Sequence, residues 1–182
     1  MTGFQSIVLT GASGGIGHAL ASRLAADGRH LLLVGRDPDR LAEAREAAAA
    51  KGAAVETAPL DVTETARLAE ALLAFDDRRP VDLVIAGAGI SSGTKPDGAP
   101  EGLDALRRVI EVNLLGAAAT IEPLIPRMVA RGHGRIVVIG SVAAHRPLPD
   151  MPAYSASKAA LRAWATAIRG RLAPQGVGVT IV

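Results

Sequence analysis

The chain has 182 residues, of which 49% are hydrophobic and 21% are charged, so it can bury a sizeable core and is not a disordered sequence. The net charge is only +2, without a dense run of Lys and Arg, which argues against a nucleic-acid partner. The absence of cysteine excludes disulfides and thiolate metal sites.

Short β-rich runs alternate with longer helical patterns along the chain. The predicted strands are Ser6–Thr10, His30–Val34, Ala54–Leu60, Val81–Ala86, Arg135–Gly140 and Val177–Val182. The predicted helices are Gly15–Asp27, Pro38–Lys51, Thr63–Phe75, Gly102–Arg131 and Met151–Leu172. Most of these strands are continuous apolar runs, which is typical of a parallel sheet covered on both faces. The alternation predicts an α/β fold, a doubly wound parallel sheet in a single domain of residues 1–182.

A glycine-rich turn joins the first predicted strand to the first helix. It reads Thr10-Gly11-Ala12-Ser13-Gly14-Gly15-Ile16-Gly17. Glycines at positions 11, 15 and 17 allow a tight turn, a close approach of backbone to ligand, and close packing of the helix on the strand. The free N–H groups and the positive dipole end of the helix suit a diphosphate. We therefore predict a dinucleotide site, the alternative being a flexible glycine loop.

The second strand leads into Val34-Gly35-Arg36. The acidic residue that usually binds the free 2′-hydroxyl of the adenosine ribose is missing there. Arg36 instead offers a guanidinium group that suits a 2′-phosphate. The sequence thus favours NADP as the cofactor, with NAD as the alternative if Arg36 only opens an exposed loop.

Three polar residues lie at informative places in the middle of the chain. Asn113 falls on the apolar stripe of a long predicted helix, where a buried amide needs hydrogen-bond partners. Ser141 directly follows the fifth predicted strand, at the sheet end where ligands bind, although a serine there is usually a turn former. Asp61 follows the third strand and could simply cap the next helix together with Thr63.

Tyr154 and Lys158 lie one helical turn apart at the start of the last predicted helix. The apolar stripe of this helix, extended backwards, includes both of them; it is formed by Leu161, Ala165, Ile168 and Leu172. A lysine on a buried stripe needs a partner, and its charge favours proton loss from a neighbouring phenol, as proton transfer near neutral pH requires. The alternative is a half-buried tyrosine beside a lysine that extends to solvent.

In order and spacing, these motifs resemble the classical short-chain dehydrogenase/reductase family, collinearly from Ile7 to Val182. The resemblance implies a Rossmann fold and a nicotinamide cofactor, with Asp61 and Val62 on either side of the adenine. The positions that would bind the cofactor are Gly11, Ser13, Gly14, Gly15, Ile16, Gly17, Arg36, Asp61, Val62, Ala88, Gly89, Tyr154 and Lys158.

The resemblance also implies hydride transfer between the nicotinamide and a small carbonyl or alcohol substrate. Tyr154 would be the general acid or base, and Lys158 would tune it and bind the nicotinamide ribose. Ser141 would polarise the carbonyl, and Asn113 would hold a water in a proton relay. The alternative is a non-catalytic dinucleotide-binding module or an inactive, truncated family member.

Two features depart from the family pattern. Ala86-Gly87-Ala88-Gly89 replaces the usual Asn-Asn-Ala-Gly, which removes two amide side chains but keeps the small residues that let a cofactor approach. The family usually continues beyond the sixth strand through a Pro-Gly loop, a substrate-covering helical segment and a final strand. We therefore expect an incomplete lid, with Val177–Val182 as an exposed edge strand.

The remaining expectations concern the substrate pocket, the oligomeric state and metal binding. The segments Ser91–Pro100 and His145–Ala153 are expected to line the substrate pocket, while the substrate itself is not indicated. By resemblance, the two longest helices pair across a twofold axis, which predicts a homodimer or homotetramer. No metal site is expected, because the four histidines lack the spacing of a ligand set.

We also expect a cytoplasmic protein without a membrane partner. The stretch Met1–Ser6 lacks the basic region of a signal peptide, and no uninterrupted apolar run reaches membrane-spanning length.

Overall fold

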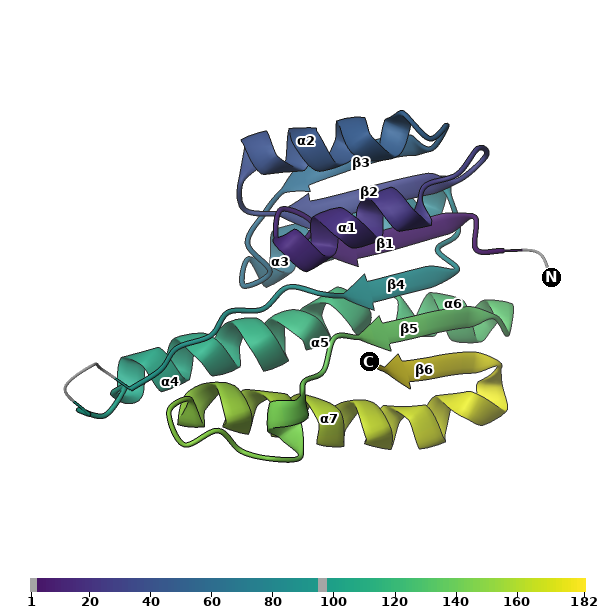
Figure 1. Ribbon diagram of the computed structural model, residues 1–182. Coiled ribbons are helices and arrows are strands. Elements are labelled where there is room, and N and C mark those ends of the chain that lie inside the picture. Colours follow the sequence, from purple (N-terminus) through teal and green to yellow (C-terminus); the bar gives the residue numbers. More distant parts are fainter. Residues whose placement is uncertain (1–2, 95–97) are drawn as a thin grey trace.

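The computed structural model describes residues 3–94 and 98–182 and contains a six-stranded parallel sheet (Figure 1). The strands are β1 (Ser6–Thr10), β2 (His30–Gly35), β3 (Ala54–Pro59), β4 (Leu83–Ala86), β5 (Gly134–Val138) and β6 (Val177–Ile181). Their order in the sheet is β3-β2-β1-β4-β5-β6. The strand order therefore reverses between β1 and β4, which is the switch point of a doubly wound sheet. This confirms the predicted fold class.

Helices cover both faces of the sheet (Figure 1). One face carries α1 (Gly15–Leu24) and α2 (Pro38–Ala49), and the other carries α3 (Thr65–Arg78), α5 (Gly116–Ile121), α6 (Ile125–Arg131) and α7 (Pro152–Leu172). The helix α4 (Leu103–Ile110) extends beyond the carboxyl ends of the strands and packs along α7 (Figure 1). Alternate residues of β1 point to opposite faces, so Ile7 and Leu9 join the core under α1 and α2, while Val8 joins the core under α3 and α7. The central strand is thus buried from both sides.

The edge strands differ from the central ones. Every residue of β1 and β4 is buried, as the apolar runs predict. At one edge, β3 exposes side chains such as Glu56 and Thr57. At the other edge of the described sheet, β6 alternates between buried and more exposed residues.

The long helix predicted over Gly102–Arg131 is not one regular α-helix. After α4, the chain passes through a π-helical turn, Glu111–Leu115, which contains Asn113, and then continues as α5. The chain leaves the helix again before α6, where Pro126 has no N–H to donate to a carbonyl one turn earlier. The apolar pattern indicated a helix here but not these two irregularities.

By length and composition, the combined stretch Leu103–Arg131 is the one helix in the described residues that could cross a membrane. In the fold, α4 packs along α7, and α5 packs against α3 and β4. Of the most apolar window of this stretch, 44% is buried inside the protein. Part of this stretch thus packs in the core of the protein, and the expectation of no membrane partner stays a prediction.

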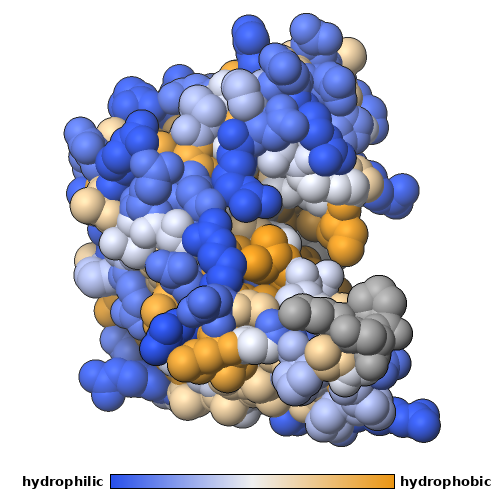
Figure 2. Space-filling view, turned by 90° about the vertical axis from the view of Figure 1, so that its left-hand side faces the viewer, coloured by the Kyte–Doolittle hydropathy of each residue, from blue (hydrophilic) through white to orange (hydrophobic). Residues whose placement is uncertain are grey.

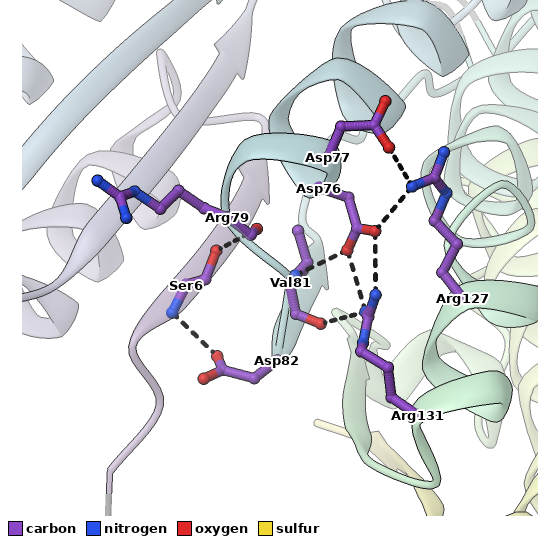
Figure 3. A network of polar contacts seen from close by, with 8 residues as sticks. All are labelled: Ser6, Asp76, Asp77, Arg79, Val81, Asp82, Arg127 and Arg131. Carbon is purple, nitrogen blue, oxygen red and sulfur yellow. Dashed lines mark hydrogen bonds and ion pairs between the residues drawn. The ribbon is translucent and has the colours of Figure 1, made fainter.

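A buried carboxylate joins α3 to α6 at the amino-terminal end of the sheet (Figure 3). Asp76, which is 2% exposed, accepts hydrogen bonds from the Val81 N–H at 2.7 Å, from Arg131 at 3.0 Å and from Arg127 at 3.3 Å. The neighbouring Asp77 is exposed and pairs with Arg127. Both oxygens of Asp76 accept hydrogen bonds, so the buried charge is fully partnered.

We expect Asp76→Asn to destabilise the protein by about 3 kcal/mol, because an amide cannot accept all these bonds and leaves a buried N–H or a guanidinium group unpaired. Asp77→Asn is the matched control, and it should leave stability close to that of the wild type because its ion pair is exposed. Urea denaturation of both variants measures the difference. Equal effects of the two substitutions would show that burial of Asp76 contributes nothing.

Candidate active site

A cleft of about 640 Å³ opens at the carboxyl ends of β1, β2 and β4. Figure 2 looks onto this end of the molecule and shows a hollow with hydrophobic surface inside and mostly hydrophilic surface above it and to its left. The cleft brings together all the predicted cofactor residues other than Tyr154 and Lys158, namely Gly11, Ser13, Gly14, Gly15, Ile16, Gly17, Arg36, Asp61, Val62, Ala88 and Gly89. Residues that the sequence analysis did not select complete the lining: Gly35, Asp37, Arg40, Leu60, Gly87, Ile90 and Val112.

The three glycines of the turn have different roles. Gly11 has a φ of +76°, and a Cβ there would lie 2.7 Å from the backbone of Gly87 and Ala88. A Cβ on Gly17 would lie 2.1 Å from the Gly11 carbonyl oxygen, so both positions are glycine because backbone packs on backbone. A Cβ on Gly15 would meet no atom within 4 Å. Protein packing therefore does not require glycine at position 15, which lines the cleft.

The start of α1 is available to an anionic ligand. Its N-cap residue is Gly14, and among the described residues no side chain caps the helix. The first turn of α1 also has no acidic residue. The amide groups and the positive dipole end of the helix are thus left to a ligand, which fits the diphosphate of a dinucleotide.

Asp61 lies between two arginines at one end of the cleft. Its Oδ2 accepts a hydrogen bond from Arg108 at 3.0 Å and lies 3.8 Å from Nη1 of Arg36. Its Oδ1 accepts from the backbone N–H and the hydroxyl of Thr63, at 3.0 and 2.9 Å. Partial burial raises the pKa of Asp61, but the hydrogen bonds from Thr63 and Arg108 outweigh this effect and hold the pKa below its usual value.

Arg108 is a residue that the sequence analysis missed. It reaches Asp61 from α4, 47 positions along the chain, so no local motif could indicate the contact. Asp37 was also overlooked, although it follows Arg36 directly. Its Oδ1 accepts from the backbone N–H groups of Asp39 and Arg40, both at 3.1 Å, and so caps α2.

Asn113 is fully buried and links the segment after β4 to α7. Its amide nitrogen donates to the Ile90 carbonyl oxygen and to the Ser157 hydroxyl, both at 2.9 Å, and its Oδ1 accepts from the Ile90 N–H at 2.8 Å. Ser157 in turn donates to the Tyr154 carbonyl oxygen at 2.7 Å. The predicted burial of Asn113 is confirmed, while Ser157 was missed despite its place between Tyr154 and Lys158.

Lys158 is buried as the helical stripe predicted, with 5% of the residue exposed. Its Nζ donates to the Ile139 carbonyl oxygen at 2.8 Å and lies 5.7 Å from the centre of the Tyr154 ring. Burial lowers the pKa of Lys158 from its usual value. A Cβ on Gly89 would lie 3.7 Å from this Nζ and 3.4 Å from Oδ1 of Asn113, so both side chains adjoin the cleft at Gly89.

Ser141 follows β5 at the same end of the sheet. Its Oγ accepts from the Ala143 N–H at 3.1 Å and caps a short 3-10 turn, Val142–Ala144, which packs on α7. The structure thus shows the turn-forming role that the sequence allowed. Asn113 is joined to α7 by a direct hydrogen bond, whereas Ser141 is joined to it through this turn.

Thr10, at the end of β1, contacts the segment Ala86–Gly89. The Gly87 N–H donates to the Thr10 hydroxyl at 3.3 Å, and a Cβ on Gly87 would lie 2.8 Å from the Thr10 carbonyl oxygen. Glycine therefore allows β1 and the end of β4 to approach closely, and the Thr10 hydroxyl adds a hydrogen bond between them.

The two segments expected at the substrate pocket meet each other, since the Thr94 N–H donates to the Asp150 carbonyl oxygen at 2.8 Å. Residues 95–97 of the first segment lie outside the described residues. No described residue of either segment lines the cleft, so their role in binding a substrate stays a prediction.

The chain matches the family model of the short chain dehydrogenases over residues 5–182. It is 37% identical over 180 residues to an uncharacterized oxidoreductase of Myxococcus xanthus, an alignment that covers 98% of this chain and 70% of the relative.

Solved structures of similar proteins contain nicotinamide dinucleotides. NAD⁺-bound xylitol dehydrogenase superposes with a TM-score of 0.89 at 27% identity, covering 97% of this chain and 68% of that protein. A metagenomic short-chain oxidoreductase in complex with NADP superposes with a TM-score of 0.89 at 28% identity, covering 97% and 80%.

The surroundings of Gly15 and Gly17 predict that alanine at position 15 affects cofactor binding, whereas alanine at position 17 affects stability. Gly15→Ala should leave thermal stability near that of the wild type but weaken NADP(H) binding about tenfold, because its methyl group enters the cleft and not the protein interior. Gly17→Ala should instead lower the melting temperature clearly, because backbone atoms must move. Thermal unfolding with and without NADPH separates the two effects. A strongly destabilised Gly15→Ala would contradict this assignment.

Proposed function

The chain belongs to the short-chain dehydrogenase family, and we propose that it is an NADP(H)-dependent oxidoreductase for small carbonyl or alcohol substrates. One observation carries this proposal. The cleft that is lined by the glycine turn and Arg36 is also lined by Gly89, which adjoins a buried lysine and a buried asparagine. A dinucleotide bound along this cleft would extend from the arginine towards α7.

The chemistry combines a hydride from the cofactor with a proton from the protein. A bound nicotinamide dinucleotide supplies or accepts the hydride. Tyr154 donates a proton to the carbonyl oxygen in reduction and takes it back in oxidation. Nζ of Lys158 lies 5.7 Å from the centre of the Tyr154 ring, so the ammonium group adjoins the proposed proton donor.

The neighbouring residues support this proton transfer. The Lys158 ammonium group has three donors, of which the Ile139 carbonyl oxygen takes one and the ribose hydroxyls would take others. The Ser141 hydroxyl accepts from Ala143 and can donate its own proton to the substrate oxygen. Asn113 connects Ile90 to Ser157, and we assign it to the proton path behind Lys158.

The preference for NADP rests on the charges at the end of the cleft. Arg36 has 61% of its side chain exposed, and Arg40 also lines the cleft. Asp37, the carboxylate next to Arg36, is occupied with capping α2. Asp61 is held by Arg108, which leaves Arg36 with only a long contact of 3.8 Å. Arg36 is thus able to turn towards a 2′-phosphate.

We further propose a cytoplasmic homo-oligomer without a nucleic-acid or membrane partner. Exposed leucines on and near α4, at positions 103, 106 and 115, support association of two copies. The helix α4 packs along α7, so an interface there would lie next to the proposed active site.

Arg36→Leu should raise the Kd for NADPH about 10- to 100-fold and leave the Kd for NADH nearly unchanged, because a charge-assisted hydrogen bond is lost only with the 2′-phosphate. Arg45→Leu, an exposed arginine on α2 outside the cleft lining, is the control. Fluorescence titration with both cofactors measures the change. An equal loss of affinity for both cofactors would contradict the proposed role of Arg36.

Tyr154→Phe should reduce turnover about 10²- to 10⁴-fold while NADPH affinity stays within about twofold, because only the proton donor is removed. The assay follows NADPH consumption with a panel of aldehydes and ketones. A wild-type protein that binds neither cofactor would refute the proposed function. Cofactor binding without turnover of any panel member would instead favour a non-catalytic binding module.

A further inference from the structure

The first turn of α7 has no cap from its own segment. Met151, at the N-cap position, makes no side-chain cap hydrogen bond, and Pro152 has no N–H. The first N–H of the helix is therefore that of Ala153, directly before Tyr154. An uncapped first turn tends to fray, which would let the tyrosine move.

Glu101 supplies this cap from another part of the chain. It precedes α4, and its Oε1 accepts from the Ala153 N–H at 3.2 Å. Its Oε2 accepts from the Ser92 hydroxyl at 2.6 Å. The carboxylate also lies at the positive dipole end of α7, where a negative charge is favourable.

A second contact fastens the same two segments. The Thr94 N–H donates to the Asp150 carbonyl oxygen at 2.8 Å. A Cβ on Gly93 would lie 3.0 Å from this oxygen, so the two backbones pass close to each other. The segment that follows Ile90 is thus tied to the start of α7 at two points, and Asn113 holds Ile90.

We propose that Glu101 is a positioning residue for Tyr154. By capping α7 and holding Ser92, it orients the first turn of α7 relative to the segment after β4, and thus the phenol relative to the cleft. The assignment rests on the proposed function, because it concerns the orientation of Tyr154 as the proton donor. Glu101 acts through the helix and does not itself transfer a proton.

The test compares Glu101→Ala and Glu101→Gln with Asp104→Ala. Asp104 is a nearby exposed carboxylate that pairs with Arg107, so its loss removes a charge but no cap. Glu101→Ala should speed hydrogen exchange of the amides at 153–158 and lower kcat about tenfold, with NADPH affinity within about twofold. Glu101→Gln should restore most of kcat, because its amide oxygen still accepts from Ala153. Asp104→Ala should match the wild type.

Two results would overturn the assignment: unchanged exchange and kcat in Glu101→Ala, or equal loss of kcat in Glu101→Gln and Glu101→Ala. If Glu101→Ala does not fold, Ser92→Ala serves in its place, since it releases the other oxygen of Glu101 and should speed the same exchange to a smaller degree. If the wild type binds NADPH but reduces no substrate, the proposed function fails, and the exchange data still test the cap.

Discussion

The site depends on one close approach of backbone to backbone, where the glycine turn after β1 meets the end of β4. The space between Gly11 and the Gly87–Ala88 peptide is too small for one methyl group. This contact brings the two halves of the sheet together at their switch point, so that the cleft opens above it. The Thr10 hydroxyl adds a hydrogen bond across the same junction. The cleft is therefore a consequence of how tightly β1 and β4 pack.

Two buried charged side chains lie at opposite ends of the sheet and differ in how completely their partners compensate the charge. Asp76, at the amino-terminal end, has two arginines and a backbone N–H as partners. Lys158, at the carboxyl end, donates to one carbonyl oxygen and lies beside a phenol, and burial lowers its pKa. The first charge is neutralised by its neighbours and the second is not. An incompletely compensated charge is costly for folding but useful where a proton must move.

Much of this arrangement could be predicted from local patterns. Apolar runs predicted the strands within two residues of their observed bounds, and helical spacing predicted that Lys158 points inwards. The contacts that hold the site together could not be predicted from such local patterns. Arg108 reaches Asp61 over 47 positions, and Glu101 reaches Ala153 over 52. Side chains that meet only after the chain has folded leave no periodic signal, and neither does the π-helical turn around Asn113.

That π-helical turn also sets the rotational phase between the two ends of the cleft. Arg108, which holds Asp61, lies before the turn, and the residues of α5 that pack on β4 lie after it. If the same five residues, Glu111–Leu115, formed a regular α-helix, α4 would be rotated by roughly 100° relative to α5. Arg108 would then face away from Asp61 while α5 kept its place. A single widened turn thus keeps the contact between Arg108 and Asp61 in phase with the residues around Asn113.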